Sequence, residues 1–122
     1  MEIGKKILVV DDEDDVRLFL SDFLSERDLA VGTAASGEEA LQKVESLRPD
    51  IVLLDIMMPG MEGLECLKQI KAKFPKTLVI MITALKDEAR IATAKKLGAQ
   101  NYIVKPFSLS YLEAELTKLI QP

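Results

Sequence analysis

The sequence predicts an α/β protein in which helices cover both faces of a parallel sheet. Short apolar runs alternate along the chain with longer segments whose apolar residues recur at helical spacing. Such alternation builds parallel sheets with right-handed crossovers. The runs 51–54 and 78–82 are apolar at every position, which is typical of strands covered on both faces. We therefore expect a three-layer, doubly wound fold of five strands and five helices.

The apolar runs predict the strands. Each is short and is bounded by charged or turn-forming residues, and the second is the weakest. The expected strands cover residues 6–10, 30–34, 51–54, 78–82 and 102–104.

The first two helices carry clear start signals. The acidic run 11–15 precedes the first helix, and carboxylates favour a helix N-terminus. The apolar residues of this helix recur at helical spacing, as Val16, Phe19, Leu20, Phe23 and Leu24. In the second helix, Ser36 and Glu39 match a capping box, and Pro49 ends the segment.

The remaining helices are bounded by glycine, proline and serine. The third lies between Gly63 and Pro75, and the fourth covers 87–97, where the apolar face is thin. Gly98 can take the left-handed conformation that ends many helices. Ser108 caps the last helix. The inner face of this helix is expected to contain Leu109, Leu112, Leu116 and Leu119 or Ile120.

Composition excludes several classes of function. The 122 residues are 48% hydrophobic and 30% charged, which indicates one folded domain. A net charge of −4 argues against a general nucleic-acid binder. No apolar run approaches the ~20 residues of a membrane span, and no signal peptide is evident, so we expect a cytoplasmic protein. The absence of His excludes histidine acid/base chemistry and serine triads, and the single Cys66 suits packing in a reducing compartment.

Polar side chains follow the predicted strands at the points where the strands end. Asp11 and Asp12 follow the first strand, Asp55 the third, Thr83 the fourth and Lys105 the fifth. The carboxyl ends of parallel strands share one edge of a sheet, so these residues should converge. Each alone is more often a cap or loop residue, but five at one edge indicate a shared site.

The residue types at this edge suit phosphoryl transfer. Carboxylates gathered in a cleft repel one another, and a hard cation with oxygen ligands, such as Mg²⁺, relieves that repulsion. Lys105 adds a positive charge and Thr83 a hydroxyl donor. Together they could stabilise an anionic group transferred to one aspartate, a reaction in which positioning and charge stabilisation supply most of the catalysis.

At this point the sequence resembles the receiver domain of two-component response regulators, the CheY-like family. The resemblance covers nearly the whole chain and is carried by ILVVDD (7–12), DIVLLDIMMPGMEG (50–63), IMITA (80–84) and GAQNYIVKPF (98–107). It implies the flavodoxin-like strand order 2-1-3-4-5. It also implies a signalling switch that promotes its own phosphorylation and dephosphorylation, rather than an enzyme.

The resemblance assigns roles to individual residues. Asp55 is implied to be the phosphoacceptor, and Thr83 and Lys105 are implied to hold the phosphoryl group with the backbone N–H of Ala84. Tyr102 is similar to the family's switch aromatic, which moves together with Thr83.

A magnesium site is implied in the same way. Asp12 would bind Mg²⁺ directly and Asp11 mainly through water, while Asp55 and the backbone carbonyl of Met57 complete the site. Met57 and Leu85 should also flank the path of the water that attacks the phosphoryl group. Both side chains are apolar, so we expect slow autodephosphorylation.

Partners follow from the resemblance too. The phosphoryl donor would be a phosphohistidine on a sensor histidine kinase or a phosphotransfer protein, and the output surface would be helix 87–97, strand 102–104 and the last helix. We expect one receiver domain over residues 1–122 with no output domain, no direct binding of nucleic acid and no membrane. It would act on a downstream protein or belong to a longer protein, as a monomer or a phosphorylation-dependent dimer.

Three other classes of protein share part of this pattern. In a haloacid-dehalogenase-type phosphatase, Asp12 would be the nucleophile within Asp12-Glu13-Asp14, but the following Gly-Thr is missing. A degenerate receiver would serve as a scaffold without phosphorylation, although the acceptor, metal and lysine set is complete. A flavodoxin-type cofactor binder would need a phosphate loop rich in Ser, Thr and Gly, where this chain has aspartates.

Overall fold

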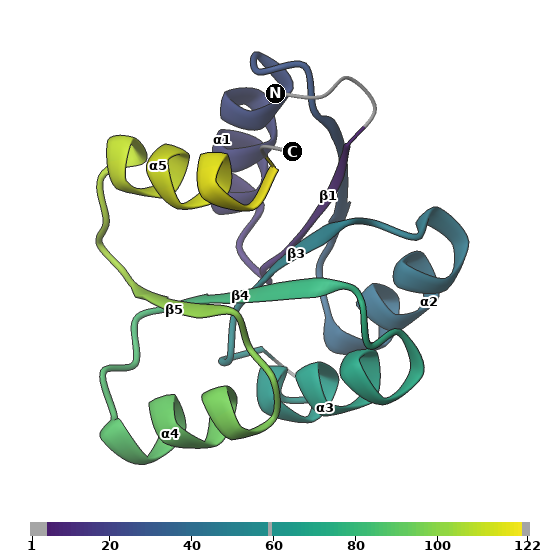
Figure 1. Ribbon diagram of the computed structural model, residues 1–122, viewed down its shortest axis with the longest axis vertical. Coiled ribbons are helices and arrows are strands. Elements are labelled where there is room, and N and C mark those ends of the chain that lie inside the picture. The colour runs from purple at the N-terminus through teal and green to yellow at the C-terminus, as the bar shows by residue number, and fades with distance from the viewer. Residues whose placement is uncertain (1–4, 59, 121–122) are drawn as a thin grey trace.

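A computed structural model of the chain, which describes residues 5–58 and 60–120, has the predicted α/β architecture (Figure 1). In chain order the elements are β1 (Lys6–Val10), α1 (Asp14–Ser25), β2 (Ala30–Ala34), α2 (Gly37–Leu47), β3 (Ile51–Leu54), α3 (Gly63–Lys73), β4 (Leu78–Thr83), α4 (Glu88–Lys96), β5 (Asn101–Val104) and α5 (Leu109–Ile120). The five strands are parallel in the order β2-β1-β3-β4-β5, which confirms the implied topology.

The sheet lies between two helical layers. Helices α1 and α5 cover one face, and α2, α3 and α4 cover the other (Figure 1). Central strand β3 is buried at every position and pairs with β1 on one side and β4 on the other. Its continuous apolar run is therefore explained by burial on both faces.

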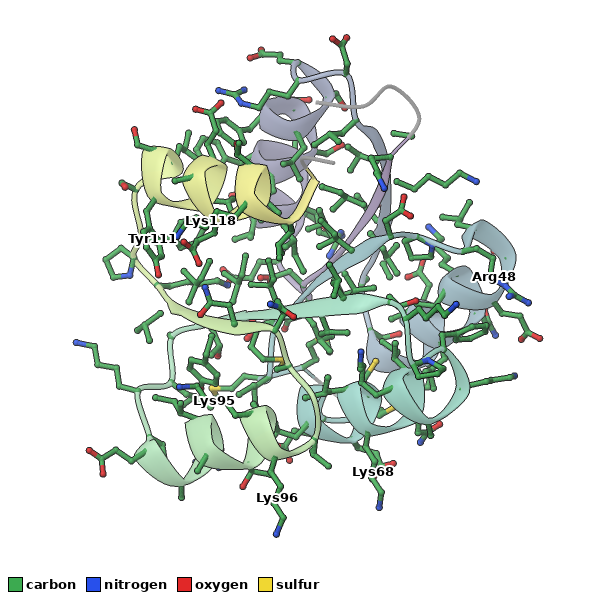
Figure 2. The ribbon with its side chains drawn as sticks, in the orientation of Figure 1. Arg48, Lys68, Lys95, Lys96, Tyr111 and Lys118 are labelled. Atoms are coloured by element: carbon green, nitrogen blue, oxygen red, sulfur yellow. The ribbon has the colours of Figure 1, made fainter. Side chains whose placement is uncertain are left out.

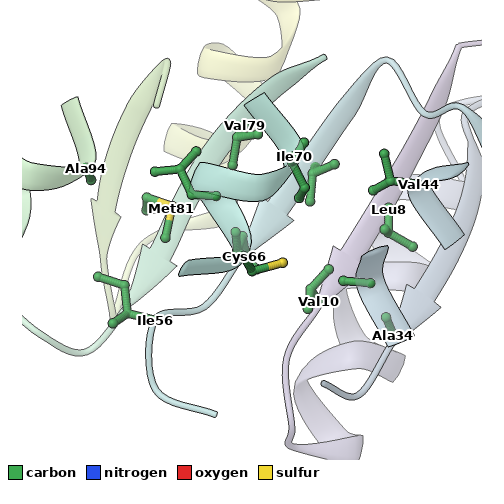
Figure 3. Close-up of a cluster of buried hydrophobic side chains, with 14 residues drawn as sticks. Leu8, Val10, Ala34, Val44, Ile56, Cys66, Ile70, Val79, Met81 and Ala94 are labelled. Carbon is green, nitrogen blue, oxygen red and sulfur yellow. The ribbon is translucent and has the colours of Figure 1, made fainter. Parts of the chain in front are cut away.

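Each layer encloses its own apolar cluster. Under α2, α3 and α4, Cys66 and Ile70 pack with Val10 and Met81 from the sheet (Figure 3). The cluster under α1 and α5 contains the alternate positions of the same strands. The outer helical faces are charged, and Lys68 of α3 and Lys96 of α4 point away from the sheet (Figure 2).

Element boundaries match the sequence signals to within one residue. Strand β4 extends to Thr83, and β5 begins at Asn101. Asp87 is the N-cap of α4, and its carboxylate accepts a hydrogen bond from the amide of Ala89 at 2.8 Å. Gly98 has a φ of 106°, so its predicted left-handed conformation is confirmed.

Two predicted caps form, one of them with a shifted partner. The hydroxyl of Ser36 accepts a hydrogen bond from the amide of Glu39 at 3.1 Å. The Glu39 carboxylate accepts from the amide of Ala35 at 2.9 Å, whereas a standard capping box would use Ser36. At α5, the Ser108 hydroxyl accepts from the amide of Tyr111 at 3.1 Å.

The apolar face of α1 is narrower than its spacing suggested. Leu20 and Leu24 are buried, but Phe19 is 57% exposed, although it recurs at helical spacing with them. Phe19 directly precedes Leu20, and successive helical residues are turned by about 100°. The Phe19 ring therefore points away from the narrow contact between α1 and the sheet.

Helix α5 packs largely as predicted. Leu112 and Leu116 are buried, while Leu109 and Leu119 are partly buried. The side chain of Ile120 lies outside the described part of the structure. Within the part of the chain that the structure describes, every helix is too short or too polar to cross a membrane.

Candidate functional site

Three aspartates converge at the carboxyl edge of the sheet. The register pairs Val10 with Leu54, so Asp11 and Asp55 leave adjacent strands side by side. One carboxylate oxygen from each of Asp11, Asp12 and Asp55 lies within 4.8 Å of the others. The predicted convergence is confirmed, and the donor set consists entirely of carboxylate oxygens.

Lys105 joins this cluster from the end of β5. Its ammonium Nζ lies 2.7 Å from Oδ2 of Asp11 and 3.3 Å from Oδ2 of Asp55. Its backbone amide donates to the carbonyl of Thr83 at 2.8 Å, which fixes the start of the loop, and the Lys105–Pro106 peptide bond is cis. One flexible cation thus bridges two buried acids.

The two neighbouring aspartates have different surroundings. Asp11 is buried, and its two oxygens accept from the amide of Glu13 at 3.0 Å and from Lys105. Asp12 is exposed, and its carboxylate accepts no hydrogen bond from any residue that the structure describes. The Asp12 carboxylate is therefore available as a ligand, while that of Asp11 is already engaged.

Asp55 lies in a buried, mixed electrostatic environment. Its Oδ1 accepts from the amide of Met57 at 3.2 Å. Burial raises the pKa of the Asp55 carboxyl, with a smaller contribution from Asp11, against the opposing effects of Lys105 and the Thr83 hydroxyl. Burial opposes the charge of Lys105, but the hydrogen bond to Asp11 and the charge of Asp55 outweigh it and raise the Lys105 pKa.

Backbone packing keeps Asp55 in place. A Cβ atom built on Gly63 would lie 2.1 Å from the carbonyl oxygen of Asp55, so only glycine lets α3 begin against this strand end. An open hollow of about 540 Å³ borders the site, lined among others by Asp12, Met57, Leu85 and Arg90. It provides space beside the carboxylates for a hydrated ion or a small anionic molecule.

The sequence profile of the response regulator receiver domain matches residues 7–117. The chain belongs to this family. A receiver domain is the phosphoacceptor of two-component signalling, a switch rather than a classical enzyme. The acidic pocket formed by Asp11, Asp12 and Asp55 lies where the strands of this receiver domain end. Membership sets aside the phosphatase and flavodoxin alternatives.

Relatives of the receiver domain have two different lengths. This chain is 38% identical to the chemotaxis protein CheY of Thermotoga maritima, and the match covers 96% of this chain and 98% of that protein. It is 45% identical to the probable transcriptional regulator ycf27 of Cyanophora paradoxa, covering 99% of this chain but 51% of that protein. The chain thus spans about half the length of that relative.

A solved structure supports the same assignment. The response regulator protein TrrA of Thermotoga maritima, in complex with Mg²⁺ and a beryllium fluoride, is 40% identical. The match covers 95% of this chain and 99% of that one, with a TM-score of 0.86.

The remaining predicted residues of the receiver domain lie at the end of β4 and on β5. Thr83 ends β4 and is buried, and Ala84, directly after it, is exposed. Tyr102 is half-buried against the cluster under α4, and its hydroxyl donates to the carbonyl of Leu85 at 2.8 Å. The Tyr102 ring therefore lies inward, against this cluster.

Two residues that make contacts near the site were not predicted from the sequence. The guanidinium of Arg17 donates to the backbone carbonyl of Asp11 at 2.6 Å. A carboxylate oxygen of Glu38 accepts from the amide of Met61 at 3.3 Å, in the loop after β3. The sequence does contain a signal for Arg17, because a cation in the first turn of a helix is electrostatically unfavourable and its presence there calls for an explanation. For Glu38 we find no such signal.

Proposed function

We propose that Asp55 accepts the phosphoryl group from a phosphohistidine on a sensor histidine kinase or phosphotransfer protein. A carboxylate oxygen of Asp55 attacks phosphorus in line, the P–N bond breaks as the P–O bond forms, and the imidazole leaves with a proton from solvent. The observation that carries the proposal is one buried carboxylate, Asp55, placed between a lysine and two further aspartates. Positioning and charge stabilisation supply most of the catalysis in such transfers.

The same pocket suits Mg²⁺. Three carboxylates that repel one another and an all-oxygen donor set match the preferences of this ion. Asp12, which has no competing hydrogen bond among the described residues, would bind directly. Asp11, already held by Glu13 and Lys105, would act mainly through water, and Asp55 and the carbonyl of Met57 would complete the site. When bound, Mg²⁺ supplies positive charge to the phosphoryl oxygens.

Three groups would hold the transferred phosphoryl group. Lys105 already contacts Asp55 on a flexible stem, so its ammonium can move to a phosphoryl oxygen and remain beside the same residue. The Thr83 hydroxyl and the backbone N–H of Ala84 are available as donors at the end of neighbouring β4. These donors would stabilise the negative charge that develops on the group.

The output would pass through α4, β5 and α5. A phosphoryl group on Asp55 would draw the Thr83 hydroxyl towards it and favour the inward position of Tyr102, changing the exposed surface of β5. The partner would be a downstream protein or an output domain of a longer chain. Both arrangements occur among the relatives, since CheY is matched over 98% of its length and ycf27 over 51%. We place this activity in the cytoplasm.

Acetyl phosphate with Mg²⁺ tests the acceptor. Intact-protein mass spectrometry should show addition of one phosphoryl group to the wild type and none to Asp55→Asn. Asp28→Asn is the matched control, because Asp28 is exposed and its φ of 62° suits asparagine. Equal phosphorylation of wild type and Asp55→Asn would refute the assignment.

Peptide mapping of the label locates the acceptor residue. Label on Asp12 instead of Asp55 would also refute the assignment. A wild type that binds Mg²⁺ but takes no phosphoryl group from any donor would indicate a scaffold.

A further inference from the structure

Arg17 occupies an unfavourable position for a cation. It lies in the first turn of α1, where the partial positive charge of the helix N-terminus repels other positive charges. Its side chain is nevertheless only 18% exposed. The guanidinium turns back towards the sheet, donates to the carbonyl oxygen of Asp11 at 2.6 Å, and pairs with the Asp14 carboxylate.

The carbonyl that Arg17 holds belongs to the peptide bond between Asp11 and Asp12. Because a peptide group is planar, fixing its oxygen also fixes the direction in which the chain enters Asp12. The amide of Asp11 is held by the carbonyl of Ala34 at 3.1 Å. The Asp12 carboxylate has no hydrogen-bond partner among the described residues, so its place depends on this backbone.

Charge alone would give Arg17 the opposite effect. A positive charge beside a cation site weakens binding of the cation, so simple electrostatics predicts tighter binding when Arg17 is removed. A loss of affinity in the same variant can come only from the geometry that Arg17 maintains. Electrostatics therefore predicts tighter Mg²⁺ binding when Arg17 is removed, whereas a positioning role predicts weaker binding.

We propose that Arg17 is a positioning residue of the magnesium site, acting through the Asp11–Asp12 peptide group. It holds that peptide so that the free Asp12 carboxylate points at the oxygens of Asp11 and Asp55. This inference rests on the proposed function, because it presupposes Mg²⁺ at the three carboxylates. Residues that hold metal ligands in place without contacting the metal themselves typically contribute 10–100-fold to metal affinity.

The test is a titration with Mg²⁺ followed by backbone amide NMR shifts around Asp12 and Asp55. Arg17→Ala should bind about tenfold more weakly than wild type. Arg17→Lys should recover part of the loss, since an ammonium can donate to the same carbonyl. Arg27→Ala is the matched control. It removes the same charge just after the end of α1, but Arg27 pairs with Glu113, so the affinity of this variant should stay within about twofold of wild type.

A further variant isolates the carbonyl contact. Asp14→Asn removes the ion pair of Arg17 but leaves its bond to Asp11, so affinity should change little. The NMR spectrum of each variant shows whether it is folded. If Arg17→Ala is not, Arg17→Met retains the stem without the donor and should show the same loss.

The outcomes are distinguishable. Unchanged or tighter Mg²⁺ binding by a folded Arg17→Ala or Arg17→Met would overturn the positioning role. Equal weakening by Arg27→Ala would also overturn it. A wild type that shows no Mg²⁺-dependent shifts at these aspartates would instead overturn the proposed function.

Discussion

At the scale of single residues, Asp55 carries a negative charge at a buried position, where the fold of the receiver domain disfavours charge. Burial raises the pKa of Asp55 above that of an exposed aspartate, so the folded state holds the ionised carboxyl less well than the unfolded chain does. A group with a raised folded-state pKa stabilises the protein most below its unfolded pKa and loses that contribution as pH rises through the folded value. At neutral pH the ionised Asp55 therefore destabilises the metal-free protein.

Asp55→Asn should consequently raise the free energy of unfolding in EDTA at pH 7, by about 1 kcal/mol, because burial penalises a carboxylate more than a neutral amide and the repulsion from Asp11 is relieved. The advantage should shrink as pH falls towards the ordinary aspartate pKa of 3.8, because wild-type Asp55 then becomes neutral as well. Urea unfolding at several pH values measures this difference. An advantage that is constant with pH, or a less stable variant at pH 7, would contradict the argument.

Met57 gives a second prediction at this scale. Its side chain is 59% exposed and lines the hollow beside the site, where an apolar group cannot orient water by hydrogen bonding. Met57→Asn supplies an amide there and should speed loss of the phosphoryl group about tenfold, below the effect of a fully positioned general base. Phos-tag electrophoresis over time gives the rate. Met57→Leu, which stays apolar, should decay like wild type, and equal rates in all three proteins would exclude the idea.

At the scale of secondary-structure elements, α4 is the most weakly anchored helix. Only Ala94 is buried within it, as its thin apolar face predicted. The loop before it is tied to β5 through the Tyr102 hydroxyl and the carbonyl of Leu85. An element with few buried contacts moves at low free energy, so a small change at Thr83 can shift it.

Beryllofluoride, which mimics the phosphoryl group, should therefore produce large amide shifts through residues 84–97 and 101–104. Thr83→Ala should shrink these shifts while Asp55 still binds the mimic, because the hydroxyl that links the two regions is gone. Ser110→Ala, at an exposed position of α5, serves as the control and should leave these shifts unchanged. Shifts confined to the loops at Asp12, Asp55 and Lys105 would show that the switch operates differently here.

At the scale of the whole molecule, patterns of burial were predictable and individual side-chain contacts were not. The continuous apolar run of β3 predicted the sheet centre, and strand ends predicted that Asp55 and Lys105 converge. Periodicity could not tell that Phe19 turns outward, since that depends on the width of the contact beneath α1. The contact of Arg17 with a backbone carbonyl leaves no periodic trace, because it depends on side-chain direction alone.

We expect the two cores and the site to unfold as one cooperative unit, as small single domains usually do, and labelling of Cys66 can report this. Its thiol is fully buried under α3, contacts the carbonyl of Gly37 at 3.8 Å, and burial raises its pKa to about 12. Labelling therefore requires the domain to open. A ligand that binds only the folded state lowers the open population by the factor 1 + [L]/Kd, so Mg²⁺ at ten times its Kd should slow labelling about tenfold.

The measurement is the rate of iodoacetamide labelling with Mg²⁺ and with EDTA, read by mass spectrometry. Asp12→Asn should show little Mg²⁺ effect, because its ligand set is incomplete, and wild type in denaturant should label fast in either buffer. If native labelling responds to neither Mg²⁺ nor mild denaturant, Cys66 is reached by local motion of α3. The site would then be energetically separate from this half of the core, contrary to a single cooperative unit.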